Sequence, residues 1–230
     1  LRPNSGISEH ALLVAGGAAG IAAAFNAPLA GVVFAIEELS RRLESRNSGL
    51  IIAAIVLAGL MGVSAFGNLS YFGVIRVPTL SWGALAPGLL VILVSGLLGG
   101  LFARLLTASL TGLSPDRFTA WRKRFPVRFA AAGGLAVAVI GLVSDGTTFG
   151  SGSETVQHML AGHADVPTLY VMLKFMATWL TAWTGVPGGI FAPSLSIGAG
   201  IGHDIAALLG MNGAGGISPA LIAMGMAGFL

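Results

Sequence analysis

The chain has 230 residues, of which 55% are hydrophobic and only 9% are Asp, Glu, Lys or Arg. Because soluble domains carry about 25% charged residues, this composition excludes an ordinary soluble protein. The absence of cysteine excludes disulfides, thiolate metal sites and a cysteine nucleophile, and the small net charge of +3 argues against a nucleic-acid partner. The 35 glycines lie inside Leu-, Ala-, Val- and Ile-rich runs, which indicates close helix packing in a bilayer.

The first apolar segments form a pair, residues 7–24 and 29–39, that is broken at Asn26, Ala27 and Pro28. Each is too short for a simple span, so two crossings and a re-entrant pair both remain open. Further apolar helices are predicted over residues 50–66, 82–113, 129–143, 166–183 and 190–211, and a last one begins at Ser218. We therefore expect an all-α integral membrane protein of tilted, broken and re-entrant helices.

Basic residues gather in two predicted loops, residues 41–46 and 117–128. They are Arg41, Arg42 and Arg46 in the first loop, and Arg117, Arg122, Lys123, Arg124 and Arg128 in the second. Two predicted crossings separate the loops, so both lie on one side, which the positive-inside rule assigns to the cytoplasm. A lipid-phosphate or nucleic-acid patch is the alternative interpretation of the second loop, but orientation explains it without a ligand.

Residues 15–21 resemble residues 223–229. The identical pairs are Ala15/Ala223, Gly17/Gly225, Ala19/Ala227 and Gly20/Gly228. Any two Gly/Ala-rich helices share some matches, so this similarity only suggests two related halves, the second continuing past Leu230. In membrane transporters such repeats place the substrate site between the halves, where broken helices meet.

The strongest chemical signal is the sequence GVPGGIFAP at residues 185–193, between two apolar helices. Gly188 and Gly189 allow close approach to the backbone, and Pro193 is tolerated in a first helical turn. A helix that begins near Ile190 presents free N–H groups, including those of Ile190 and Phe191, to an anion. Amide dipoles bind a halide weakly enough to release it, as conduction requires. A plain helix–helix connection is the alternative.

Residues 24–38 (AFNAPLAGVVFAIEE) and 188–193 (GGIFAP) resemble two signature segments of the CLC family of chloride channels and chloride/proton exchangers. The resemblance covers essentially the whole chain and implies the middle of a CLC membrane domain, from about helix G to the start of helix O, without a soluble domain. It implies an inverted repeat and a chloride site at Gly188, Gly189, Ile190 and Phe191, with N–H groups of the last two as donors.

The resemblance also carries expectations about the whole protein. It implies a homodimer with part of its interface on residues 29–39 and 51–66, in a bacterial inner membrane. The first filter segment and the gating glutamate are expected before Leu1, and the coordinating tyrosine after Leu230, so we expect the chain to be part of a longer one. Chloride and protons would be its substrates, with no cofactor.

Glu37 and Glu38 lie at the cytoplasmic end of an apolar helix. The residues alone allow either interfacial carboxylates paired with Arg41 or Arg42, or a proton relay. In the CLC resemblance, Glu38 matches the internal proton-transfer glutamate of many exchangers, where channels tend to have an apolar residue. We therefore expect a chloride/proton exchanger, with Glu37 lining water access to Glu38 or binding an arginine; a passive chloride channel is the alternative.

Three other features carry smaller expectations. Lys174 is the only charge in its predicted helix, and it either supports the site electrostatically or neutralises a carboxylate. His203 and Asp204 are a possible polar pair. Residues 150–153 with His158 allow a remote alternative, an intramembrane hydrolase, although they lack the spacing of a nucleophile elbow. The histidines do not have the spacing of a metal site, and we predict no enzyme activity.

Overall fold

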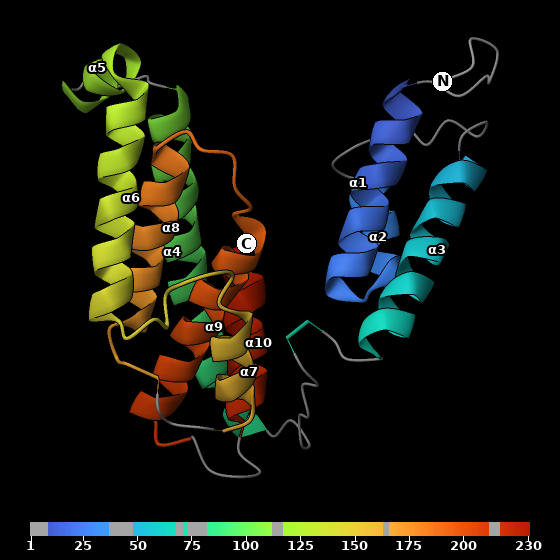
Figure 1. The fold of residues 1–230 in the computed structure, drawn as a ribbon. Coiled ribbons are helices and arrows are strands. Elements are labelled where there is room, and N and C mark those ends of the chain that lie inside the picture. Colours follow the sequence, from blue (N-terminus) through green and yellow to red (C-terminus); the bar gives the residue numbers. More distant parts are fainter. Residues whose placement is uncertain are drawn as a thin grey trace. The chain divides into compact units, whose positions relative to one another are not determined.

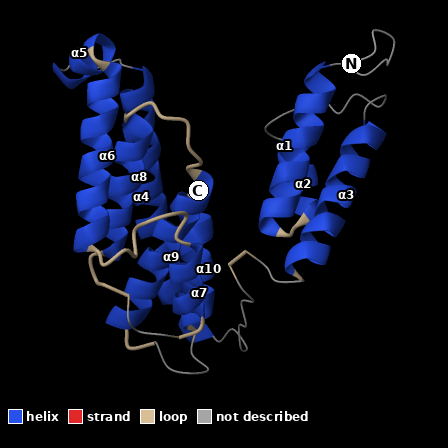
Figure 2. Cartoon of the chain, in the orientation of Figure 1, coloured by secondary structure: helices blue, strands red, loops and turns tan. Residues whose placement is uncertain are grey.

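The computed structural model describes residues 9–36, 48–67, 71–72, 82–111, 117–162, 166–211 and 217–230. Within these ranges the regular structure is helical and there is no strand, as Figure 2 shows. The chain divides into two compact units, Leu1–Val74 and Ile75–Leu230, which are described separately below. The predicted all-α class is confirmed.

The first unit contains α1 (Glu9–Phe25), α2 (Pro28–Phe34) and α3 (Ser48–Phe66). The predicted break is confirmed, because Asn26 adopts a positive φ of 50° and Pro28 occupies the first turn of α2. A Cβ atom on Gly31 would lie only 2.6 Å from the carbonyl oxygen of Ala18, so α2 packs directly on the backbone of α1. Small side chains therefore set the spacing of this helix pair.

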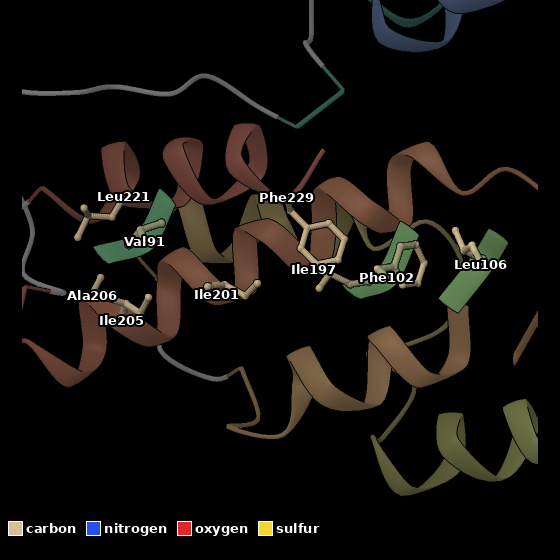
Figure 3. Close-up of a cluster of buried hydrophobic side chains, with 9 residues drawn as sticks. All are labelled: Val91, Phe102, Leu106, Ile197, Ile201, Ile205, Ala206, Leu221 and Phe229. Carbon is tan, nitrogen blue, oxygen red and sulfur yellow. The ribbon is translucent and has the colours of Figure 1, made fainter. Parts of the chain in front are cut away.

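The second unit is a longer helical bundle. It comprises a 3-10 turn (Trp82–Ala84), α4 (Leu85–Thr111), α5 (Arg117–Arg124), α6 (Pro126–Val143), α7 (Ser153–Leu160), α8 (Tyr170–Trp183), α9 (Phe191–Leu208) and α10 (Ser218–Phe229). In Figure 1, α8 packs along α4 and α6, with α5 at one end of the bundle and α7 toward the other. Figure 3 shows the core, where α4, α9 and α10 bury Val91, Phe102, Leu106, Ile197, Ile201, Ile205, Ala206, Leu221 and Phe229.

Helices α9 and α10 pack closely through glycine. A Cβ atom on Gly202 would lie 2.7 Å from the Cα atom of Ile222, and one on Gly198 would lie 2.9 Å from the Cα atom of Met226. The inference that glycine serves close helix packing is confirmed at this contact. Gly225 is buried here, whereas Gly17, its partner in the sequence similarity, is exposed on α1. The internal repeat stays a prediction.

Two short helices lie in polar segments of the second unit. Helix α5 forms inside the second basic cluster, which has no Gly or Pro before Pro126 begins α6. Helix α7 follows Gly152, which has a φ of 83°, and it has Glu154 in its first turn, where a carboxylate stabilises the helix dipole. The loop interpretation of residues 117–128 was wrong because short helices in polar segments lack a strong apolar period.

Two described helices are long and apolar enough to cross a membrane, Trp82–Thr111 and Pro126–Val143. Only 28% and 11% of the residues in their most apolar windows are buried within the chain. A helix in the core of a soluble protein would be mostly buried, whereas these expose leucines such as Leu97 and Leu135. Their surfaces therefore suit contact with lipid or with further protein in a bilayer.

Candidate anion site

A cavity of about 240 Å³ lies at the N-terminal end of α9. Its walls come from α6, α8, the loop after α6 and the loop before α9. The lining residues are Val137, Thr148, Phe149, Gly150, Lys174, Ala177, Thr178, Thr181, Ala182, Val186, Gly188, Gly189, Ile190 and Pro193. The sequence predicted Gly188, Gly189 and Ile190 together, and they share this cavity. Phe191, the fourth predicted residue, begins α9 but does not line it.

The chain reaches this cavity through a defined turn. Helix α8 ends where Gly185 adopts a φ of 79° and donates its N–H to the carbonyl of Ala182 at 3.1 Å. In Figure 1 the chain then runs back from the α5 end of the bundle, so α9 begins within the length of α6 rather than beside its end. A helix terminus at this depth is the arrangement by which broken helices present backbone charge inside a membrane.

The backbone N–H groups of Gly188, Gly189 and Ile190 have no acceptor in the part of the chain that the structure describes. The first hydrogen bond inside α9 runs from the Ser194 N–H to the carbonyl of Ile190 at 2.9 Å. Because α9 has 18 residues, its macrodipole adds about half a positive charge at this end. The loop can therefore donate hydrogen bonds to an anion.

Lys174 contributes a full positive charge to the wall of the same cavity. Its side chain is 1% exposed, and Nζ donates to the carbonyl oxygens of Thr148 and Gly150, both at 2.8 Å. No described carboxylate lies within ion-pair distance of Nζ, and the cavity lining contains no Asp or Glu. A buried cation without a carboxylate leaves the cavity electropositive, so a bound anion would supply its counter-charge.

The threonine hydroxyl groups in the wall do not add donors. Thr178 donates its hydroxyl proton to the carbonyl of Lys174 at 2.8 Å, and Thr181 donates to the carbonyl of Ala177 at 2.7 Å. A hydroxyl has only one proton, so these groups offer the cavity acceptor lone pairs and methyl groups. The donors that remain for an anion are the loop amides and the third proton of Lys174.

Hydrogen bonds brace the loop that contains the carbonyl partners of Lys174. The Ser144 and Thr148 hydroxyls share a hydrogen bond of 2.8 Å at the end of α6, and the Ser196 hydroxyl donates to the carbonyl of Gly152 at 3.3 Å. Tyr170 in turn bonds to the Ser196 hydroxyl. Sequence reasoning did not find this bracing, because backbone carbonyls leave no residue-type signal; only the glycines at positions 150 and 152 hint at a shaped loop.

The other predicted residues have different outcomes. Glu37 and Glu38, with Arg41 and Arg42 beside them, lie outside the described residues. His203 and Asp204 do form the expected polar pair, with Nδ1 and Oδ1 3.5 Å apart. The buried Nδ1 makes no hydrogen bond in the described part of the chain.

The residues of the hydrolase alternative line a second cavity of about 610 Å³ at the far end of α6, together with Asp145 and Glu154. The Ser151 hydroxyl donates to the Ser153 hydroxyl at 3.2 Å. A serine nucleophile donates its hydroxyl proton to a base, whereas the Ser151 proton goes to another serine. The arrangement offers no support for a hydrolase.

Residues 2–230 match the family model described as the voltage gated chloride channel, Voltage_CLC. The chain belongs to this CLC family. It is 32% identical over 205 residues to the H(+)/Cl(-) exchange transporter ClcA of Vibrio parahaemolyticus, and 32% identical over 209 residues to the protein of the same name in Vibrio vulnificus. Each alignment covers 87% of this chain and 43% of the relative, so the chain spans less than half the length of these CLC proteins.

Family membership confirms the resemblance found in the sequence. It also agrees with the exposed apolar surfaces of α4 and α6, because CLC proteins are integral membrane proteins. In the described part of this CLC chain, the electropositive cavity at α9 has a lining whose chemistry fits an anion.

Proposed function

We propose that the full-length protein exchanges chloride for protons across a membrane and binds chloride at the N-terminus of α9. The observation that carries this proposal is one cavity that joins the amides of Gly188, Gly189 and Ile190 to buried Lys174 without a carboxylate in its lining. The relatives named H(+)/Cl(-) exchange transporter support chloride and protons as the substrates.

The donor set suits an ion that must leave as well as enter. Backbone dipoles at a helix N-terminus supply a partial positive charge, and Lys174 is already held by two carbonyl oxygens. An anion therefore meets a positive electrostatic field. Among the described lining residues it does not meet a free guanidinium or ammonium group, which would bind it too tightly to release it. We place Phe191 in the same anion-binding segment, as the CLC resemblance implies.

Crystals of the full-length protein grown in bromide test the anion site. We expect an anomalous difference peak within hydrogen-bonding distance of the Gly188, Gly189 or Ile190 amides, because bromide replaces chloride at such sites and scatters anomalously. A peak elsewhere in the protein with none at this cavity would exclude the assignment. Chloride competition provides the control, since the peak should weaken as chloride replaces bromide.

Exchange, rather than passive conduction, rests on Glu38 as the inner proton carrier, with Glu37 beside its water access. An apolar residue at this position would favour a channel, and the sequence has a carboxylate there. A passive chloride channel is the second candidate, favoured by the description of the family model. The two candidates differ in one observable: only the exchanger moves protons when chloride flows.

We further propose a multi-pass position in a bacterial inner membrane and a homodimer through α2 and α3. Both helices expose large apolar side chains, including Leu29, Leu57, Leu60 and Met61. Lipid covers such residues on a monomer, and a second copy covers them in a dimer. Cysteine cross-linking at this surface tests the proposed interface.

A further inference from the structure

A basic and aromatic surface lies where α5 meets the start of α6, at one end of the second unit (Figure 1). We call it the α5–α6 corner and define it by Phe118, Trp121, Lys123, Arg124, Phe125 and Arg128. All six side chains are exposed, among them Phe118 at 56%. The anion cavity does not use any of them.

Contacts to α4 and α8 hold this corner in a fixed position. Nη1 of Arg122 donates to the carbonyl of Ser109 at 2.9 Å and to that of Trp183 at 3.1 Å, and so caps the last turns of both helices. The Trp183 ring also packs on Phe118 and Phe129, with centroid distances of 5.6 and 5.3 Å. Helix α5 is therefore a rigid part of the bundle.

The charge of Arg122 is compensated by carbonyl groups at the C-terminal ends of α4 and α8. The exposed cations of the corner do not have such partners in the part of the chain that the structure describes. The Cζ atoms of Arg124 and Arg128 lie 5.3 and 5.1 Å from the centroid of the same Phe125 ring. Neither arginine, nor Lys123, has an ion pair with a described residue. The two arginines held on one ring repel one another unless an anion lies between them, and Lys123, next to Arg124 in the sequence, adds a third exposed positive charge.

The end of α6 strengthens the case for an anion. Arg128 lies in the first turn of α6, where the helix dipole is positive and an arginine is unfavourable. An anion at the corner would compensate both Arg128 and this helix terminus. Guanidinium groups match the two oxygens of a phosphate in a bidentate geometry.

The aromatic side chains indicate which class of phosphate-containing ligand the corner binds. Trp121 and Phe118 are exposed beside the cations, and such rings are typical of the boundary between headgroups and acyl chains. A soluble phosphate or a nucleic-acid backbone would use the cations but would leave the apolar faces of these rings in water. An anionic lipid satisfies both parts of the surface.

We propose that the α5–α6 corner binds an anionic phospholipid headgroup of the cytoplasmic leaflet. Arg124 and Arg128 hold the phosphate, Lys123 adds positive charge, and Trp121 with Phe118 contacts the glycerol and upper acyl region. The α5 end faces the cytoplasm by the positive-inside rule, and anionic lipids in that leaflet attract basic segments. This site is separate from chloride transport, so either proposal can fail alone.

Native mass spectrometry of the full-length protein tests the lipid site. Phosphatidylglycerol and phosphatidylcholine are titrated into delipidated protein, and retained lipid is counted. We expect retention of phosphatidylglycerol but not phosphatidylcholine, and about a tenfold weaker affinity for phosphatidylglycerol in Arg124→Gln/Arg128→Gln. Arg124→Lys/Arg128→Lys should lose less phosphatidylglycerol affinity than the glutamine variant, because it keeps both positive charges. It should still bind more weakly than the wild type, because lysine lacks the bidentate guanidinium geometry.

A matched pair of single variants distinguishes a specific lipid site from a non-specific effect of positive charge. Arg128→Gln should weaken phosphatidylglycerol binding, whereas Arg104→Gln, which removes an exposed charge from α4, should not. Equal loss in both variants, or unchanged binding in the double variant, would overturn the proposal. So would displacement of the lipid by millimolar inorganic phosphate or by RNA, because the surface would then be specific for soluble phosphates. Unchanged melting temperatures verify that the variants fold.

Discussion

At the scale of single residues, Lys174 has two tasks. Its ammonium group ties the loop after α6 to α8 through the carbonyls of Thr148 and Gly150, and it charges the cavity beside Ile190. The surrounding hydrogen bonds are made by backbone and hydroxyl groups, so the charge itself is left for a ligand. This combination explains how a lysine can be buried in an apolar helix.

Replacing Lys174 separates these tasks. We expect Lys174→Met to weaken chloride binding about tenfold through the lost charge. The same variant should destabilise the protein by about 1–3 kcal/mol, because the buried carbonyl of Thr148 and the partly buried carbonyl of Gly150 lose their donor. Calorimetric chloride titration and thermal unfolding of the full-length protein measure the two effects.

Two controls accompany that measurement. Lys174→Arg keeps the charge and should retain most chloride affinity, and Thr178→Val removes a hydroxyl whose proton already bonds within α8. The valine variant should bind chloride within about twofold of the wild type, since the hydroxyl has no proton to offer an anion. Wild-type chloride affinity in Lys174→Met would refute an electrostatic role for Lys174.

At the scale of elements, the contact between α9 and α10 fixes the helix that carries the proposed anion site. Because Gly202 and Gly198 lie against the backbone of α10, the two helices approach without intervening side chains. A shift of α9 would move its N-terminus and the amides before it. The packing of this pair and the geometry of the site are therefore coupled.

Glycine-to-alanine substitutions test this contact. Gly202→Ala places a Cβ 2.7 Å from the Cα of Ile222, so we expect a loss of about 1–3 kcal/mol in unfolding free energy. Gly16→Ala on α1 meets nothing within 4 Å, and its higher helix propensity should stabilise by up to about 1 kcal/mol. Denaturation of both variants measures the difference; equal effects would mean that α9 and α10 do not pack through Gly202.

Sequence reasoning predicted the elements unevenly. Breakers with a specific geometry, such as Pro28 after Asn26 and the glycines around residue 188, marked the helix ends correctly. Helix α5 was missed because its stability comes from Arg122 capping α4 and α8, a contact between residues far apart in sequence. The site was predicted as a helix terminus but without Thr148 and Gly150, since their carbonyls carry no side-chain signature.

At the scale of the whole molecule, a large apolar surface must be covered by lipid or protein. The α3 residues Leu57, Leu60 and Met61 are each more than 60% exposed, which suits a partner as well as a bilayer. The chain spans 43% of the length of its curated relatives, so further protein can also cover part of this surface.

The proposed homodimer predicts a specific cross-link. This chain contains no cysteine, so Leu60→Cys introduces a defined thiol in the proposed interface. In a cysteine-free full-length background, oxidation should give a covalent dimer, because a two-fold interface brings equivalent surfaces together. Leu135→Cys on α6, outside the proposed interface, is the control. Cross-linking at residue 135 but not at 60 would place the interface elsewhere.

Proton movement driven by chloride tests the central claim most directly. The full-length protein is reconstituted in vesicles, a chloride gradient is imposed, and a pH dye reports the lumen. We predict that chloride flow moves protons against their own gradient in the wild type. In Glu38→Gln the proton signal should disappear while chloride flux persists, and Glu37→Gln should retain coupling. Chloride flux without any proton movement in the wild type would contradict exchange and establish a passive channel.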